Sequence, residues 1–126
     1  MDHQELLRLA EEARERAYAP YSGFRVGAAL LCEDGEVFFG CNIENASFTP
    51  TCCAERVAIF SAVKEGKRDF SAIAVVGNDD PCAPCGVCRQ VMSEFCSEEF
   101  SVILKGKEGK PLVLTLSALL PHRFSL

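Results

Sequence analysis

The chain has 126 residues and a formal net charge of −5, with 48% hydrophobic and 25% charged residues. This ordinary globular balance predicts one domain with a single core, spanning residues 1–126. Proteins that bind nucleic-acid polymers are typically basic, so the acidic charge argues against such a partner. No apolar run approaches the length of a membrane span, and residues 1–5 are charged. We therefore expect a soluble, untargeted cytoplasmic protein without a membrane partner.

The first half of the chain predicts a helix, a β-hairpin and a second helix. The expected elements are a helix over 2–17, strands over 26–32 and 37–43 around a turn at 33–35, and a helix over 53–65. Apolar residues recur at helical spacing in the first segment, and Pro20 disfavours helix in the residue before it. The Glu-Asp-Gly turn is typical of a hairpin, and Gly66 closes the second helix.

The second half predicts three more strands and two more helices. The expected elements are a strand over 70–76, a helix over 85–95, strands over 100–104 and around 112–114, and a short helix over 116–120. Residues 70–76 are apolar throughout, which indicates a strand covered on both faces. Residues 106–109 are too few for a crossover helix, so the last two strands should pair antiparallel. Together these elements predict an α/β fold with a five-stranded mixed sheet and helices on both faces.

Two short motifs carry the chemistry, and each lies at a junction between a strand or loop and a helix. One is Cys53-Ala54-Glu55 and the other is Pro84-Cys85-Gly86-Val87-Cys88. Three protein ligands leave the fourth position of a tetrahedral zinc ion open, as in catalytic sites. Helix N-termini also stabilise thiolates. The motifs therefore predict one Zn²⁺ per chain, held by Cys53, Cys85 and Cys88, with Glu55 close enough to handle the protons of a bound water.

The cysteine pattern leaves other arrangements open. Eight cysteines in a short chain also occur in disulfide scaffolds, although those are typical of secreted proteins. A closed structural zinc site could recruit Cys52 or Cys82 as a fourth ligand, which would leave Glu55 without a role. An iron–sulfur run would need a cysteine near position 92, where Met92 stands. The CxxC motif alone is also compatible with a redox pair.

The two motifs together resemble the zinc signature of the cytidine deaminase family, with cysteine in place of histidine in the first motif. The resemblance extends from Tyr18 to Phe124 and includes Tyr-Ser-Gly-Phe-Arg-Val-Gly-Ala-Ala-Leu at 21–30 and Leu-Leu-Pro-His-Arg-Phe at 119–124. It implies the three-layer cytidine-deaminase-like fold of the small homotetrameric type with an all-cysteine zinc site. It also implies hydrolytic deamination of free cytidine and 2′-deoxycytidine, with release of ammonia, in pyrimidine salvage.

The same resemblance implies roles for individual residues. Glu55 would take a proton from water, deliver it to ring N3 and later protonate the leaving ammonia. Asn42 and Glu44, which alternation places on one side of their strand, would hold the ribose, chiefly its 3′-hydroxyl. Arg56 would compensate the negative charge of the three thiolates by hydrogen bonding to the ligand sulfurs. The other implied substrate contacts are Phe24, Asn45, Ala46, the backbone of Ala54, and Phe124, which would cover the pyrimidine of an adjacent subunit in a homotetramer.

One loop differs from the family pattern, and two other functions are compatible with the same residues. Phe48-Thr49-Pro50 stands where Tyr-Gly-Leu is common in the family, so a phenolic hydroxyl is lost and the loop is stiffer. Nothing in the ribose pair reads the 2′-position, so both cytidine and deoxycytidine should fit. One rival function is a zinc deaminase that acts on a modified base or a blasticidin-like analogue. The other is a zinc-stabilised interaction module without catalytic activity.

Overall fold

A computed structural model describes all residues from Met1 to Leu126. Five strands form one sheet in the order β2-β1-β3-β4-β5. They are β1 (Gly27–Cys32), β2 (Val37–Cys41), β3 (Phe70–Val76), β4 (Ser101–Lys105) and β5 (Pro111–Thr115). β1 is antiparallel to β2 and β3, β3 is parallel to β4, and β4 is antiparallel to β5. The predicted mixed sheet and both of its hairpins are thus confirmed.

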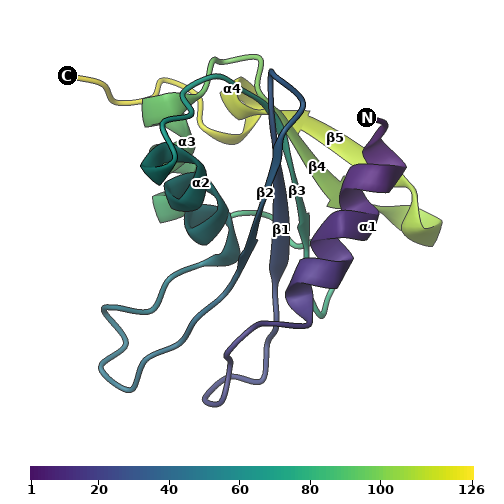
Figure 1. The fold of residues 1–126 in the computed structure, drawn as a ribbon, viewed down its shortest axis with the longest axis vertical. Coiled ribbons are helices and arrows are strands. Elements are labelled where there is room, and N and C mark those ends of the chain that lie inside the picture. The colour runs from purple at the N-terminus through teal and green to yellow at the C-terminus, as the bar shows by residue number, and fades with distance from the viewer.

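Helices cover both faces of this sheet, which confirms the predicted three layers (Figure 1). The helices are α1 (His3–Arg14), α2 (Ala54–Lys64), α3 (Gly86–Phe95) and the short α4 (Leu116–Leu119). α1 lies alone on one face, and α2 and α3 lie on the other. A single 3₁₀ turn, Lys107–Gly109, joins β4 to β5. No helix combines the length and apolar character needed to cross a membrane.

β3 contributes to two hydrophobic cores because its side chains alternate between the faces of the sheet. Ala74 and Val76 pack in the cluster that contains Leu6 and Ala10 of α1. Ile73 and Val75 pack in the larger cluster under α2 and α3. The prediction that Phe70–Val76 is covered on both faces is therefore confirmed, with only Ser71 exposed. Burial of a valine, leucine or isoleucine side chain contributes roughly 1.5–3 kcal/mol.

Most predicted bounds differ from the structure by a single residue, but two elements end two or three residues before their predicted ends, and tertiary pairing explains both differences. α1 ends at Arg14 rather than at residue 17, because the chain leaves the helix to let the Tyr18 N–H donate to the Asn42 carbonyl at 2.9 Å. β2 ends at Cys41 rather than at residue 43, because Ile43 forms bridges with Tyr18 and Cys52 instead. These bridges hold the bases of two loops together at one end of the sheet.

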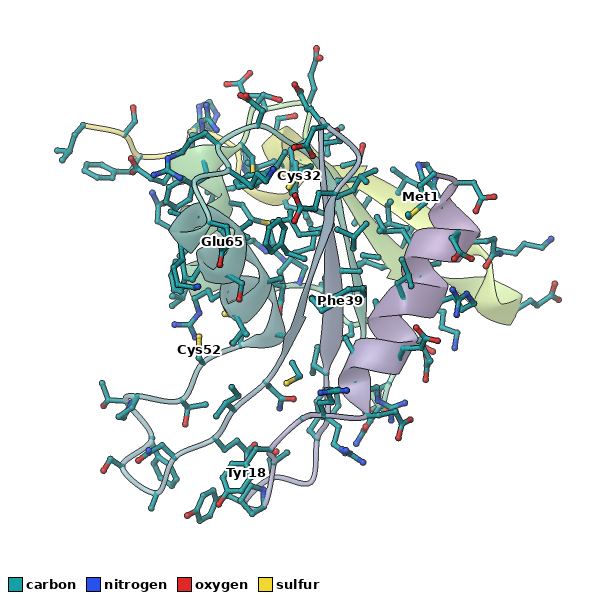
Figure 2. The ribbon with its side chains drawn as sticks, viewed as in Figure 1. Met1, Tyr18, Cys32, Phe39, Cys52 and Glu65 are labelled. Atoms are coloured by element: carbon teal, nitrogen blue, oxygen red, sulfur yellow. The ribbon has the colours of Figure 1, made fainter.

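The register of the sheet places both cysteine motifs at that end. Gly27, the first residue of β1, pairs with Cys41 at the end of β2 and with Val76 at the end of β3. The loops that lead to α2 and α3 therefore start at the same end of the sheet, one on each side of β1. Gly40 permits the close approach of α2, since a Cβ atom there would lie only 2.1 Å from the Ala54 carbonyl oxygen. Figure 2 shows Cys52 at this end of the molecule, just before α2.

Candidate metal centre and active site

The sulfur atoms of Cys53, Cys85 and Cys88 form a cluster where α2 and α3 begin. Cys53 Sγ lies 4.0 Å from Cys85 Sγ, and Cys85 Sγ lies 3.6 Å from Cys88 Sγ. All three sulfurs lie within 4.8 Å of one another. A tetrahedral zinc ion with Zn–S bonds of about 2.3 Å separates its sulfur ligands by about 3.8 Å. The cluster therefore fits three corners of a zinc tetrahedron, and its members are the three predicted ligands.

Two of these cysteines occupy the N-cap positions of their helices. Cys53 caps α2 and Cys85 caps α3, both with extended backbone and neither with a side-chain hydrogen bond to its helix. An N-cap side chain normally accepts from an amide of the first turn. Here the sulfurs face each other instead, and the positive ends of both helices stabilise negative charge on them. Each helix thus begins one residue after its predicted start, and the cap residue is the metal-ligand candidate.

The structure also decides among the other cysteine arrangements. Cys52 and Cys82 line the neighbouring cavity, but neither belongs to the cluster of potential metal ligands. All eight cysteines are free thiols. A closed four-cysteine site is therefore not formed, and the geometry favours an open site with three protein ligands.

Hydrogen bonds within the cluster favour the thiolate form of Cys53. Hydrogen bonding from the Cys88 thiol, with that from Arg56, lowers the pKa of Cys53 to about 5 against the opposing effect of burial. The hydrogen bond to Cys53, together with burial, raises the pKa of Cys88 above its ordinary value. Arg56 Nη2 donates to Cys53 Sγ at 3.3 Å. The guanidinium therefore lies where compensation of thiolate charge requires it, although this role stays a prediction.

Glu55 is the only charged residue that is buried, with 4% of its surface exposed. It lies in the first turn of α2, two residues after Cys53, and lines the same cavity as the Cys53 and Cys85 sulfurs. Burial raises its pKa to about 7, and a hydrogen bond from its own backbone amide opposes this shift. A carboxyl group with a pKa near neutrality can both accept and donate a proton, as a general acid–base catalyst must.

A cavity of about 260 Å³ opens beside the sulfurs. Most of the predicted site residues line it: Phe24, Asn42, Glu44, Cys53, Ala54, Glu55 and Cys85. The sequence analysis did not assign a role in the pocket to the remaining lining residues, which are Ser22, Val26, Thr51, Cys52, Cys82 and Ala83. Ser22 and Val26 lie within the 21–30 stretch that carries the family resemblance, which is the signal that could have identified them.

The two residues predicted to hold ribose already make hydrogen bonds within the chain. Asn42 Oδ1 accepts from the Val26 N–H at 2.9 Å, and Asn42 Nδ2 donates to the Phe24 carbonyl at 2.7 Å. Asn42 therefore also fixes the segment that carries Phe24. Glu44 Oε1 accepts from the backbone N–H groups of Tyr21 and Ser22. Both side chains line the cavity on the side formed by the loop before β1.

Three predicted substrate contacts lie outside this cavity. Asn45 lines an adjoining surface pocket, and its side chain accepts from the Ser47 N–H at 3.0 Å. Ala46 is exposed and lines neither pocket. Phe124 is 66% exposed and lies in the C-terminal tail beside α3, where Gln90 Nε2 donates to its carbonyl (Figure 1). Phe124 does not cover the cavity of its own chain.

Phe48, the first residue of the loop segment that differs from the family pattern, also lies outside the cavity. Its side chain is 73% exposed, and its backbone has a left-handed φ of 64°. The turn is closed by the Phe48 N–H, which donates to the Asn45 carbonyl at 2.9 Å. Phe48 lines the adjoining surface pocket together with Asn45. The loss of a phenolic hydroxyl here therefore changes the rim of the site rather than the cavity beside the sulfurs.

An open three-sulfur metal site next to a buried carboxyl group, on a three-layer α/β fold, defines a zinc-dependent hydrolytic enzyme. The family model described as "Cytidine and deoxycytidylate deaminase zinc-binding region" matches residues 1–104. The chain belongs to this family of zinc-dependent deaminases.

Curated relatives and solved structures agree with this assignment. The chain is 53% identical to the cytidine deaminase of Halalkalibacterium halodurans, over 99% of this chain and 96% of the relative. It is 50% identical to the cytidine deaminase of Sporosarcina psychrophila, over 99% of this chain and 93% of the relative. The crystal structure of cytidine deaminase from Burkholderia pseudomallei is 52% identical and superimposes with a TM-score of 0.94, over 98% of this chain and 100% of that chain.

Proposed function

We propose that the protein catalyses the hydrolytic deamination of free cytidine to uridine, with release of ammonia. The observation that carries this proposal is the placement of Glu55. It is the only buried charged residue of the chain, and it shares a small cavity with a sulfur cluster that fits zinc. A structural zinc site or an interaction module has no use for such a carboxyl group, whose burial destabilises its charged form.

The residues of the chain divide the chemistry among them. Cys53, Cys85 and Cys88 would hold zinc, which when bound supplies activation of a water molecule at neutral pH. The Glu55 carboxylate takes a proton from the attacking water and delivers it to N3 of the pyrimidine. A C4–O bond forms, and Glu55 then takes the second proton from the new C4 hydroxyl and transfers it to the amino group. The C4–N bond breaks, ammonia leaves, and C4 becomes the carbonyl of uridine, which keeps the first proton on N3. Arg56 offsets the net negative charge that three thiolates give to the site.

The substrate in this proposal is a free nucleoside, either cytidine or 2′-deoxycytidine, and the reaction serves pyrimidine salvage. The cavity of about 260 Å³ lies just below the roughly 300–1,000 Å³ of pockets for drug-sized ligands. Phe24 and the Ala54 backbone bound the base, and Asn42 and Glu44 hold the ribose through its 3′-hydroxyl. The net charge of −5 disfavours a polynucleotide substrate.

The proposal extends to assembly and location. Residues 1–126 act as one domain, and four copies form a homotetramer in which Phe124 covers the cavity of a neighbour, with Asn45 and Ala46 at its rim. Exposed apolar side chains support an interface over β2, α2 and α3: Phe39 is 48%, Phe60 46% and Val87 58% exposed. Eight free cysteines suit the reducing conditions of the cytoplasm.

The test is ammonia release from cytidine by zinc-loaded protein, measured with a coupled enzymatic assay. The substrate panel contains cytidine, 2′-deoxycytidine, free cytosine, deoxycytidylate and a blasticidin-type analogue. The proposal expects turnover of both nucleosides and little turnover of free cytosine, which lacks the ribose. Turnover of only the analogue would identify the rival deaminase. A folded, zinc-loaded protein that releases no ammonia from any of these substrates would instead favour the interaction module.

A further inference from the structure

Ser22 connects the side chain of Glu44 to the backbone of Phe24, and both of these residues line the cavity. Its hydroxyl donates to Glu44 Oε2. Ser22 Oγ also accepts a hydrogen bond from the Phe24 N–H at 3.0 Å. Glu44 Oε1 accepts two further bonds, from the Tyr21 N–H at 2.9 Å and the Ser22 N–H at 3.1 Å. The carboxylate of Glu44 is therefore held by a loop that lies more than twenty residues before it in the chain.

The number of bonds defines what Glu44 can still do. An ionised carboxylate accepts about four hydrogen bonds, two on each oxygen. Three are made within the chain, which leaves one acceptor position, on Oε2. A glutamate is already an ionised acceptor at neutral pH, and these bonds, chiefly that from the Ser22 hydroxyl, lower the pKa of Glu44 further. Glu44 can thus receive one hydroxyl donor from a ligand in a fixed direction.

The loop itself is secured without the Ser22 hydroxyl. The Gly23 N–H donates to the Ala19 carbonyl at 3.0 Å, and Asn78 Nδ2 donates to the Gly23 carbonyl at 3.0 Å. Farther along, Asn42 accepts from the Val26 N–H and donates to the Phe24 carbonyl. Other hydrogen bonds thus secure this loop at several points, and within the loop the Ser22 hydroxyl adds only the bond that it accepts from the Phe24 N–H. Ser22 is the only side-chain donor to the Glu44 carboxylate.

We propose that Ser22 is a positioning residue for nucleoside recognition, which orients the Glu44 carboxylate so that its one free acceptor site meets the ribose 3′-hydroxyl. This inference rests on the proposed function, because it needs a nucleoside in the cavity. A carboxylate that is already ordered loses little conformational freedom when the ligand binds, which favours affinity. The hydrogen bond that Ser22 Oγ accepts from the Phe24 N–H also couples the ribose side of the cavity to the side that bounds the base.

Ser22→Ala tests this proposal in the zinc-loaded protein. A hydrogen bond to a charged group contributes enough for removal of the Ser22 donor to raise the KM for cytidine by on the order of tenfold. kcat should change less than KM, and zinc content and Tm should stay at wild-type values. Ser22→Thr, which keeps the hydroxyl, should restore the wild-type KM. Ser71→Ala is the matched control, since Ser71 is exposed on β3 and its hydroxyl makes no hydrogen bond.

A 3′-deoxy ligand separates positioning from a general loop effect. The inhibition constant of 3′-deoxycytidine against cytidine turnover should change less than about twofold in Ser22→Ala, because this ligand lacks the hydroxyl that meets Glu44. An equal rise for both ligands, an unchanged KM for cytidine, or a loss of zinc or Tm would each overturn the positioning role. Failure of the proposed function is distinct from these outcomes, because the wild-type protein itself would then release no ammonia from cytidine.

Discussion

Cys53 and Cys85 cap the N-termini of two different helices, and their sulfur atoms lie 4.0 Å apart. The helices reach this position because the ends of β2 and β3 flank Gly27 in the sheet. Cys88 completes the set from the first turn of α3, where it is fully buried. The metal site therefore depends on the packing of α2 and α3 over one end of the sheet.

Loss of any one sulfur should remove zinc and activity together. Cys53→Ala, Cys85→Ala and Cys88→Ala each leave only two protein ligands, which is below the three of catalytic zinc sites. Metal content by mass spectrometry should fall from one zinc per chain toward zero, with parallel loss of ammonia release from cytidine. Cys52 and Cys82 line the cavity but lie outside the sulfur cluster, so Cys52→Ala and Cys82→Ala are the matched controls. Both variants should keep their zinc and their activity. Zinc retained in Cys53→Ala but lost in Cys52→Ala would show that the ligands are assigned incorrectly.

Arg56→Gln should weaken zinc binding without unfolding the chain. The Arg56 guanidinium donates to Cys53 Sγ, so its removal leaves the thiolate charge less compensated. A hydrogen bond to a charged group contributes roughly 1.5–3 kcal/mol, so the zinc dissociation constant should rise about tenfold or more. Competition with a chelator measures this change. Arg16→Gln is the control, since Arg16 is exposed and makes no side-chain hydrogen bond. Equal zinc affinities in Arg56→Gln and Arg16→Gln would reject the role of Arg56.

Asn42 and Glu44 should differ in how much they stabilise the fold, a difference that the sequence motif did not indicate. Asn42→Ala removes the amide that joins the Phe24 carbonyl to the Val26 N–H, so we expect a lower Tm by several degrees as well as poorer cytidine turnover. Glu44→Gln keeps the size of the side chain in an exposed network and should mainly raise the KM for cytidine. Thermal melts and kinetics on both variants check this. A Tm for Asn42→Ala that is no lower than that for Glu44→Gln would contradict this difference between the two residues.

Phe124→Ala should raise the KM for cytidine while zinc stays bound. Stacking of an aromatic ring on a base contributes roughly 1–3 kcal/mol, or about 5- to 150-fold in affinity. Because Phe124 lies outside the cavity of its own chain, this effect requires a neighbouring subunit. Leu126→Ala, at the fully exposed end of the same tail, is the control.

Mixed oligomers test the cross-subunit role of Phe124 directly. Co-assembly of Glu55→Gln subunits with Phe124→Ala subunits should form some sites with both residues intact and recover activity above that of either parent. Verified mixed oligomers with no more activity than the average of their parents would reject the cross-subunit contact.

The sequence predicted which residues carry the chemistry of the site, but not the hydrogen bonds that position them. Residue spacing identified Cys53, Cys85 and Cys88, because a ligand set requires particular residue types close to helix starts. Hydrophobic patterns and turn residues also identified all five strands and all four α-helices, because most of these elements bury one or both faces. The structure was needed to show that Ser22 holds Glu44 and that Asn42 holds Phe24. Such bonds join segments distant in sequence, and no local pattern encodes them.

The same reason explains the wrong element ends. Helical spacing continued past Arg14 to residue 17, but the backbone bonds of Tyr18 to the segment after β2 ended the helix earlier. Likewise, Ile43 was predicted to belong to the strand over 37–43, but it pairs with Cys52 across the base of a loop. Local propensity could not anticipate either pairing, because both partners lie in other parts of the chain.

The comparison of wild-type protein with Glu55→Gln tests the central claim most directly. Glutamine nearly matches glutamate in shape and removes a buried charge, so the variant should keep its fold and its zinc. It cannot transfer protons, and general acid–base catalysis alone contributes roughly 10²–10⁴-fold. At equal zinc content, we predict that the wild-type protein releases one ammonia per cytidine consumed. We also predict that the turnover rate of Glu55→Gln is lower by more than the roughly 10²–10⁴-fold contribution of acid–base catalysis. A zinc-loaded Glu55→Gln protein within about tenfold of the wild-type rate would contradict the account, because that loss is smaller than the loss of a general acid–base catalyst.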